Sequence, residues 1–253
     1  MKIAVLVKQT PQLSEVAWGG DGLKWPDDVL AVNPFDEYAV EEAIRIKEKI
    51  GGATIAITFG GPDSVSVLRD VLALGIDEAY QVQSDNYSST DPQSNARALA
   101  ACIQKIGDVD LVLTGKSASD DDSGLVGPAV AGQLDWPQIS YVKKIEKIED
   151  SSLIAWRTTD SGHDVVESSL PAVCSVVKEI NEPRLPSLKG KMKAKKAQIT
   201  SFTLQDLGVE PTPIIKIKSI EAPPPRPQGE ILQGETDEVI EALYRKLKDD
   251  KLI

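Results

Sequence analysis

LVLTGKSASDDDSGLVGPAVAGQLDWPQISYV, residues 111–142, is the stretch that decides the fold. A short apolar run over 110–114 predicts a buried strand that ends at Gly115. The polar loop 115–124 follows, and the small and apolar residues of 125–134 predict a helix packed closely on a sheet. In open α/β sheets, ligands bind where such loops leave the carboxyl ends of strands. The free N–H groups at a helix start attract an anion, so the stretch predicts a nucleotide-phosphate site.

The same loop has a second interpretation, because many strand-loop-helix units bind nothing. Asp120, Asp121 and Asp122 carry negative charges that repel a phosphate. They could instead cap the helix, bind a ribose hydroxyl or be solvated. Neither G-x-G-x-x-G after a strand nor G-x-x-x-x-G-K-[ST] occurs in the chain. The residues alone therefore leave open whether this loop holds a ligand.

Composition narrows the class of protein. The chain has 253 residues and a net charge of -11, enough for one large domain, and the acidic balance argues against nucleic acid as the main partner. Cys102 and Cys174 lie far apart with no Cys/His cluster, so we expect neither a metal site nor a disulfide framework. The start MKIAVLVKQT is too quickly polar for a signal peptide, and no apolar run approaches a membrane span. We therefore expect a cytoplasmic protein.

Strand and helix patterns alternate through the first half of the chain. Asn33 is expected to cap a helix that Pro34 begins, with Asp36 in the first turn near the positive end of the helix. This alternation predicts a mostly parallel sheet with helices on both faces. Strands are predicted at 3–7, 53–58, 79–82 and 111–113, and helices at 37–50, 64–74, 92–106 and 125–134.

The pattern changes after Ile139. Alternating residues on both sides of a turn at 160–162 predict antiparallel strands, and 170–177 predicts another buried strand. From Asn181 onward the chain no longer resembles a domain, although an amphipathic helix is expected near 236–248. A tail of this kind has little of its own to pack on, so we expect it to wrap a partner subunit. The alternative is a tail that folds back on its own domain.

Several stretches together resemble the β subunit of electron transfer flavoproteins, in the family's order and nearly from end to end. The resemblance implies an α/β, three-layer Rossmann-like fold of the adenine nucleotide hydrolase type, with a mostly parallel sheet, an antiparallel hairpin region and an extended C-terminal arm. It implies a nucleotide-binding domain over 1–180, a dehydrogenase recognition loop over 181–200 and an arm over 201–253 that wraps the α subunit. The stretches are MKIAVLVKQ, NPFDEYAVEEAIRIKE, FGGPDSVSVLRDVLALGIDEA, LVLTGKSASDDDSGLVGPAVAGQLDWPQ, LPAVCSVVKEINEPRLPSL and KMKAKK.

The resemblance also implies a function. The family forms heterodimers in which FAD, held mainly by the α subunit and shared at the interface, carries electrons. These pass from dehydrogenases, here acyl-CoA dehydrogenases of fatty acid oxidation, to a quinone-linked oxidoreductase. The β subunit binds a structural AMP and turns over no substrate, so the chain is expected to be an electron carrier subunit and not an enzyme. A hydrolase or ligase on a related scaffold would need a glycine- and serine-rich loop where this chain has Lys8-Gln9-Thr10-Pro11. The recognition-loop and tail matches disfavour a nucleotide-sensing module.

The family's nucleotide contacts fall on strand ends and on the loop before 125–134. Gly60 and Gly115 would let backbone approach the ligand closely. Phe35 matches a phenylalanine that packs near the flavin of the α subunit. The implied cofactor-binding residues are Leu6, Asn33, Pro34, Phe35, Asp36, Gly60, Gly115, Lys116, Ser117, Asp120, Asp121, Asp122, Ser123, Gly124, Leu125 and Val126.

The ligand of this pocket has two candidates. Leu125-Val126 stands where many members carry Gln-Thr, which removes a hydroxyl and an amide donor. Electron-bifurcating members hold a second FAD in this pocket, oxidise NADH there, and tend to have valine before Gly-Pro. In contrast, NPFDEYAVEEA resembles the AMP-binding branch. AMP is therefore the expected ligand and a second FAD the alternative.

The segment 184–196 resembles the loop by which the β subunit anchors on an acyl-CoA dehydrogenase. Leu188 stands at the position of the anchoring leucine, and an exposed leucine can fill a partner's pocket. Leu185-Pro186-Ser187-Leu188-Lys189 departs from the common Tyr-Ala-(Thr/Ser)-Leu-Pro form, and the lysines could alternatively form a solvated face. The implied partner-binding residues are Arg184, Leu188, Lys191, Met192 and Lys193.

Overall fold

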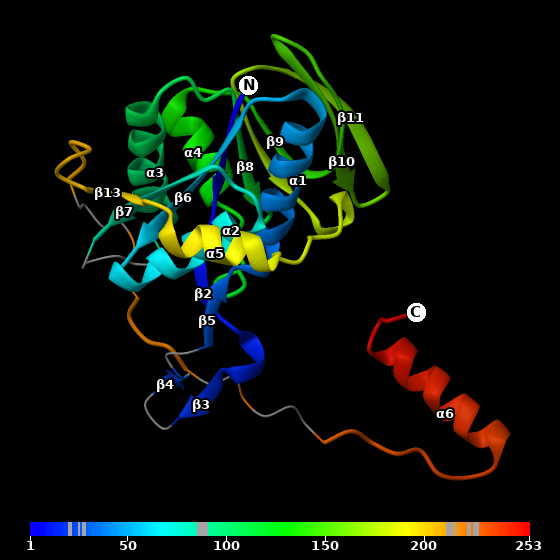
Figure 1. Cartoon of the computed structure of the whole chain (residues 1–253). Coiled ribbons are helices and arrows are strands. Elements are labelled where there is room, and N and C mark those ends of the chain that lie inside the picture. The colour runs from blue at the N-terminus through cyan, green and yellow to red at the C-terminus, as the bar shows by residue number, and fades with distance from the viewer. Residues whose placement is uncertain are drawn as a thin grey trace. The chain divides into compact units, whose positions relative to one another are not determined.

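The computed structural model describes residues 1–19, 22–24, 26, 29–84, 91–210, 215, 217–221, 224 and 228–253 (Figure 1). The chain divides into two compact units, Met1–Ser219 and Ile220–Ile253. The first unit contains the sheet and five α-helices among its described residues, and the second contains helix α6 (Thr236–Asp249). Each unit is considered by itself below.

The main sheet has nine strands within the described residues, in the order β11-β10-β9-β12-β8-β1-β6-β7-β13. Every pairing from β9 to β13 along this order is parallel, whereas β9, β10 and β11 form an antiparallel meander. The predicted fold class is confirmed. The strands are β1 (Lys2–Leu6), β6 (Ala53–Gly60), β7 (Glu78–Gln83), β8 (Leu111–Gly115), β9 (Gln138–Ile148), β10 (Ser152–Thr159), β11 (Gly162–Ser169), β12 (Ala172–Val176) and β13 (Thr200–Thr203).

Helices cover both faces of this sheet. Helices α1 (Pro34–Ile50) and α2 (Val65–Leu74) pack on one face, and α3 (Pro92–Ile106) and α4 (Val126–Leu134) on the other (Figure 1). Because successive side chains of a strand point to opposite faces, Ile3 and Val5 join the first core and Ala4 and Leu6 the second. The core is thus two apolar layers separated by the sheet.

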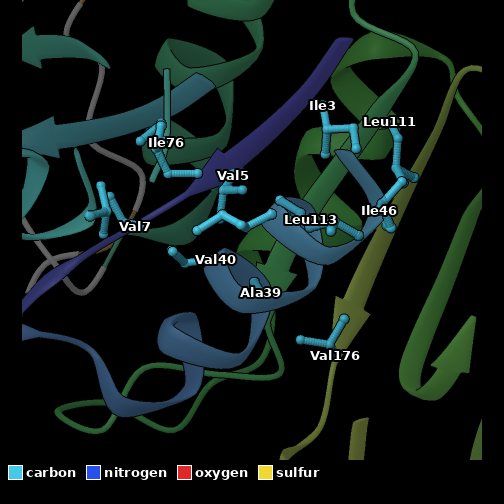
Figure 2. Close-up of a cluster of buried hydrophobic side chains, with 14 of the residues drawn as sticks. Ile3, Val5, Val7, Ala39, Val40, Ile46, Ile76, Leu111, Leu113 and Val176 are labelled. Atoms are coloured by element: carbon cyan, nitrogen blue, oxygen red, sulfur yellow. The ribbon is translucent and has the colours of Figure 1, made fainter. Parts of the chain in front are cut away.

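The layer beneath α1 illustrates this packing. Figure 2 shows Val5 of β1 and Leu113 of β8 directed toward Ala39 and Val40 of α1. All four side chains are fully buried. Small alanines let the helix lie close to the sheet, while the branched residues fill the space between them. The helical spacing of apolar residues in the sequence therefore identifies the face of α1 that contacts the sheet.

The order of the strands creates a crevice beside β1. The chain runs from β1 through α1 to β6 and through α2 to β7, all on one side of β1, and then returns through α3 to β8 on its other side. Connections that leave neighbouring strands in opposite directions leave a gap between their loops. Ligands of open α/β sheets bind at such a switch point. The carboxyl ends of β1 and β8 therefore mark the place for a site.

Helix α1 begins as the sequence predicts, with one difference. Pro34 occupies the first turn and Asp36 and Glu37 follow, while Gly51 ends the helix with φ +78. Asn33 is the N-cap residue by position, but its side chain makes no capping hydrogen bond. It bonds instead to the loop after β8, which only the tertiary structure brings near. The expectation that the Asn33 side chain caps this helix was wrong.

The segment between β1 and α1, expected to be a loop, has structure of its own. It contains two small antiparallel ladders, β2 with β5 and β3 with β4, and a 3-10 turn, η1 (Leu13–Glu15). These ladders are separate from the main sheet (Figure 1). Their strands are β2 (Gln9–Pro11), β3 (Ala17–Gly19), β4 (Gly22–Lys24) and β5 (Leu30–Val32). Two further 3-10 turns are η3 (Pro62–Ser64) and η4 (Lys178–Ile180).

The first unit extends further than the boundary at 180 that we expected. Helix α5 (Leu188–Lys196) packs on α2, and β13 adds a parallel edge strand beside β7. A Cβ added to Gly190 would lie 2.2 Å from the carbonyl oxygen of Ala73, so only glycine allows α5 to approach α2 this closely. Arg69 of α2 donates to the carbonyl of Ala194, 2.7 Å away, near the end of α5. Residues 181–203 therefore belong to the α/β unit.

Helix α6 is amphipathic, with its apolar residues on one stripe and acidic residues in its first turn. None of its residues is buried. Across the described ranges no helix is long and apolar enough to cross a membrane. The same part of the chain contains no group of three or more His, Cys, Asp or Glu side chains placed to hold a metal ion. Cys102 and Cys174 are buried and unpaired with each other.

Candidate nucleotide-binding site

A cleft of about 630 Å³, open to solvent, lies at the switch point. Its walls come from the ends of β1, β6 and β8, from both helices of the second layer and from the loop before α4. The lining residues are Leu6, Val7, Lys8, Asn33, Asp36, Phe59, Asn95, Leu99, Thr114, Gly115, Lys116, Ser117, Ala118, Asp121, Ser123, Gly124, Leu125, Val126 and Gly127.

Most of the predicted cofactor-binding residues line this cleft. Those that do are Leu6, Asn33, Asp36, Gly115, Lys116, Ser117, Asp121, Ser123, Gly124, Leu125 and Val126. Pro34, Phe35, Gly60, Asp120 and Asp122 lie outside its lining. Gly60 is buried, and a Cβ there would come within 2.8 Å of Ser64, so its small size serves the turn after β6. Whether each residue contacts a ligand stays a prediction.

Sequence reasoning missed part of the lining. Asn95 and Leu99 come from the first turns of α3, and Phe59 from the end of β6. The signal for α3 is a polar Asn95 one turn after the helix start, in a position that proves only 5% exposed. A helix that begins at the carboxyl edge of the sheet presents its first turns to the crevice. The other missed residues are Val7, Lys8, Thr114, Ala118 and Gly127.

Asn33 and Asp36 tie the two strand ends together. The Asp36 carboxylate accepts from the backbone N–H of Lys8, 2.8 Å away, and of Gly115, 3.1 Å away. The Asn33 amide donates to the carbonyl of Ser117 at 2.8 Å and accepts from the N–H of Ser119 at 3.0 Å. We call these two side chains the cleft clamp. It fixes the loop after β8 relative to the end of β1.

The Asp36 carboxyl is buried, with 6% of its surface exposed. Burial raises its pKa to about 7, although hydrogen bonds from the Lys8 amide, Asn33 and the Gly115 amide act in the opposite direction. Desolvation disfavours the charged carboxylate, and donated hydrogen bonds favour it. The charge state of this clamp therefore changes near neutral pH.

The three consecutive aspartates organise the loop. Asp120 and Asp121 pair with the ammonium of Lys8, at 2.6 and 3.4 Å. Asp121 also accepts from the N–H of Ser123 at 2.9 Å, and Asp122 accepts from the hydroxyl of Ser117 at 2.6 Å. Neither capping of α4 nor simple solvation describes them. Their charges are held by partners within the loop and by Lys8, which follows β1, and this reduces their repulsion of an anion.

The loop ends at the first turn of α4. Gly124 adopts φ +63, a left-handed conformation that favours glycine, and Val126 is the first residue of the helix. A Cβ added to Gly127 would come within 2.9 Å of the Thr114 hydroxyl, so the helix start lies tightly against β8. The first N–H groups of a helix have no intrahelical acceptor. They and the helix dipole suit an anionic group at this end of the cleft.

Phe35 lies beside the cleft and not in its lining. The ammonium of Lys116 is 4.7 Å from the centre of its ring, within the range of a cation–π contact. Lys116 itself lines the cleft. Phe35 therefore orients a cleft residue, and its predicted proximity to a flavin of another subunit stays a prediction.

The predicted partner-binding residues fall into two groups. Leu188, Lys191, Met192 and Lys193 are exposed on or at the start of α5, with 78% of Leu188 and 59% of Met192 accessible. Arg184 is instead engaged within the chain. Its guanidinium bonds to Glu41, with Nε 2.7 Å from Oε2, and to Glu48, with Nη1 2.7 Å from Oε1. These bonds, first to Glu48 and then to Glu41, raise the pKa of Arg184.

The model of the electron transfer flavoprotein domain matches residues 27–207, which is more than half of the chain. The match includes every residue that lines the cleft except Leu6, Val7 and Lys8. The chain belongs to the electron transfer flavoprotein family. Several relatives in this family match it over nearly its whole length. The β subunit from Thermoanaerobacterium thermosaccharolyticum is 36% identical over 262 residues, covering 100% of both chains. The β subunit from Sus scrofa is 36% identical, covering 96% of this chain and 92% of its own.

A third relative is named as a subunit of a larger complex that contains a reductase. Subunit CarD of the caffeyl-CoA reductase-Etf complex of Acetobacterium woodii is 37% identical over 264 residues, covering 100% of both chains. The family of electron transfer flavoproteins consists of electron carriers that involve a flavin. The recognised resemblance to their β subunits is confirmed by these matches.

Proposed function

We propose that this chain is the β subunit of a heterodimeric electron transfer flavoprotein and that AMP occupies its cleft in a structural role. The observation that carries the proposal is the cleft at the switch point, lined by the loop that the family resemblance assigns to the nucleotide. FAD, held mainly by an α subunit, supplies the electron-carrying chemistry when it is bound. The chain then serves as a carrier subunit with no substrate turnover of its own, and a cytoplasmic location stays a prediction.

The residues of the cleft fit an adenine nucleotide. Leu6, Phe59 and Leu99 provide apolar surface of the kind that holds a purine ring. Asp121 offers a carboxylate acceptor to a ribose hydroxyl, and Gly124 leads into the free N–H groups of α4. The two ends of the cleft thus differ in polarity in the way that a base and a phosphate differ. This complementarity supports AMP.

A second FAD in the same cleft is the alternative. Leu125 and Val126 bring no side-chain donor to the phosphate end, which weakens the argument for a dedicated AMP site. The relative from Acetobacterium woodii belongs to a complex with a reductase. An electron-bifurcating β subunit that oxidises NADH at this FAD is therefore the second candidate function.

Three partners belong to the proposal. Leu188 and Met192 expose apolar surface among lysines on α5, which suits a pocket on a flavin dehydrogenase with an acidic rim. We propose an acyl-CoA dehydrogenase or similar enzyme, in line with the caffeyl-CoA reductase complex of the relative. The apolar stripe of α6 has no buried residue and suits the α subunit. A quinone-linked oxidoreductase would accept the electrons.

The nucleotide content of the purified complex tests the proposal. The chain is produced with its α subunit, the complex is denatured, and the released nucleotides are quantified by chromatography. We expect one AMP and one FAD per heterodimer. Two FAD and no AMP would make bifurcation the leading function, whereas a chain that forms no complex and releases neither nucleotide would contradict both.

A pair of variants locates the AMP. Val126→Trp puts a large ring at a half-buried position of the cleft lining, so we expect it to remove AMP and leave FAD in place. Val165→Trp makes the same change in size at an exposed position of β11 and should leave both contents unchanged. Retention of AMP by Val126→Trp would place the nucleotide elsewhere.

A further inference from the structure

Tyr141 has an unusual backbone conformation for a residue inside a strand. Its φ is +60, in the left-handed region that bulky side chains rarely adopt. The parallel pairing of β9 with β12 places Ile139 opposite Cys174 and Val142 opposite Val176, so two residues of β9 face Ser175 alone. This is a β-bulge, a feature that redirects a side chain. The Tyr141 N–H keeps a partner, since it donates to the Ser175 hydroxyl at 3.2 Å.

The bulge brings the phenol to the phosphate end of the cleft. A Cβ added to Gly124 would lie 3.8 Å from the Tyr141 hydroxyl oxygen. Gly124 lines the cleft directly before the first turn of α4. Tyr141 is 47% exposed, and its hydroxyl makes no hydrogen bond to the residues that the structure describes. A donor with no partner among the described residues therefore lies close to Gly124, two residues before α4 begins.

Strain of this kind has a physical implication. A left-handed conformation costs a non-glycine residue about 1–2 kcal/mol and persists where the surrounding structure imposes it, often at ligand sites. Coverage of apolar surface does not account for it well, because nearly half of the side chain is exposed. The position of the hydroxyl near Gly124 explains the strained backbone better than packing of the ring does.

The two lysines that line this part of the cleft already have contacts within the chain. Lys8 pairs with Asp120 and Asp121, and Lys116 lies over the Phe35 ring. Leu125 and Val126 supply no donor. Among the described residues, the hydroxyls of Ser123 and Tyr141 are therefore the side-chain donors near the start of α4 that remain available to a ligand.

We propose that Tyr141 is a ligand-binding residue whose hydroxyl donates a hydrogen bond to the phosphate of the adenine nucleotide in the cleft. This role rests on the proposed function, since it requires a nucleotide whose phosphate lies at the start of α4. Tyr141 adds, from a strand on the far side of β12, a side-chain donor where Leu125 and Val126 bring none. It belongs to neither the loop nor the lining residues of the cleft.

The test compares a nucleotide with its nucleoside. The heterodimer is depleted of nucleotide and titrated by calorimetry with AMP and with adenosine, which lacks the phosphate. Tyr141→Phe removes the hydroxyl alone and should weaken AMP binding about 5- to 20-fold, in line with the loss of one charge-assisted hydrogen bond, while adenosine binding stays within 2-fold. Tyr80→Phe removes a hydroxyl of β7 that donates to Glu78 and should leave both affinities unchanged.

Each other outcome overturns the proposal. An unchanged affinity of Tyr141→Phe for AMP would exclude the hydrogen bond. An equal loss of AMP and adenosine binding would assign Tyr141 a structural role, which a lowered melting temperature would corroborate. Wild-type protein that binds neither ligand would overturn the nucleotide assignment itself and this role with it, so the two failures are distinguishable.

Discussion

Helix α1 carries two polar clamps that differ in their partners. The cleft clamp, Asn33 and Asp36, lies at the start of the helix and bonds to backbone groups after β1 and in the loop after β8. The second, which we call the Arg184 clamp, joins Glu41 and Glu48 to Arg184 in the segment before α5. One connects the helix to the proposed nucleotide site and the other to the proposed partner-binding segment. A single helix thus serves as the common support for both surfaces.

The two clamps hold their charges differently. In the cleft clamp a buried carboxyl meets neutral N–H groups, so burial dominates and the pKa of Asp36 is raised. In the Arg184 clamp the buried carboxylate of Glu41, 5% exposed, meets a guanidinium. Where a buried acid has only neutral hydrogen-bond donors, its protonation changes with pH. Where it is paired with a cation, the stability of the fold depends on keeping that cation. We therefore expect the cleft clamp to be sensitive to pH and the Arg184 clamp to be sensitive to loss of the arginine.

The largest expected effect is a pH dependence that arises from Asp36. The folded state holds the proton up to a pKa of about 7, while the unfolded chain releases it near 3.8, so stability falls as pH rises from 4 to 7. At about 1.4 kcal/mol per pH unit, the contribution reaches as much as about 4 kcal/mol. We expect the free energy of unfolding of the wild type, measured by urea titration, to fall over this range relative to Asp36→Asn.

The Asp36→Asn variant is the reference because its amide side chain has no titratable group. Other acids contribute equally to both proteins, so the difference between the two curves isolates Asp36. Parallel curves from pH 4 to 7 would mean that the two donated N–H bonds keep this carboxyl ionised, and the contrast between the clamps would disappear.

Loss of the cation in the Arg184 clamp should have the next largest effect. Arg184→Met leaves the buried Glu41 carboxylate with Arg45, 3.3 Å away, and with the backbone N–H of residue 184, 3.2 Å away. Because the guanidinium is lost, we expect the variant to lower the free energy of unfolding by about 1–3 kcal/mol. The matched control is Arg245→Met in α6, where Arg245 and Glu241 are both largely exposed. Such a pair contributes about 0.2–1 kcal/mol. Equal losses from the two variants would show that burial of Glu41 does not matter.

The smallest of the three effects is expected for Asn33→Ala. The variant removes two neutral hydrogen bonds, to Ser117 and Ser119, and should cost about 1–2 kcal/mol in a thermal or urea melt. Gln9→Ala also removes two hydrogen bonds of a side-chain amide, but both are exposed, so its loss should stay below about 0.5 kcal/mol. A cost of Asn33→Ala no larger than this control would mean that the loop does not need the clamp.

Much of the fold could be predicted from local patterns. Alternation of apolar runs and helical stripes predicted the main-sheet strands and the α-helices from 3 to 134, because each pattern reflects which face of that element is buried. The small ladders between residues 9 and 32 were not predicted. Strand β13 was missed. Its four residues, TSFT, form a half-exposed edge strand, and such a strand carries no strong pattern of its own. It exists because β7 leaves an edge beside it, which no local window contains.

The site was predicted less completely than the fold. Residues on the loop after β8 could be named because they are contiguous, and the resemblance added the start of α1. Leu99 and Phe59 enter the cleft from α3 and β6, which lie outside both the loop after β8 and the start of α1. The Asn33 side chain shows the same limitation, because its bonds join residues 84 and 86 positions apart. Side-chain partners across such separations depend on topology.

Gly190 has a consequence for how the family can vary. Its Cα touches α2 so closely that any side chain would meet the carbonyl oxygen of Ala73. A relative that carries a larger residue at this position must hold its α5 farther from α2, and the apolar residues at the start of that helix move with it. One position without a side chain therefore sets how far the proposed partner-binding surface stands out from the body of the subunit. A substitution of this glycine would therefore change which partner can bind the surface, even if every exposed residue of the surface stayed the same.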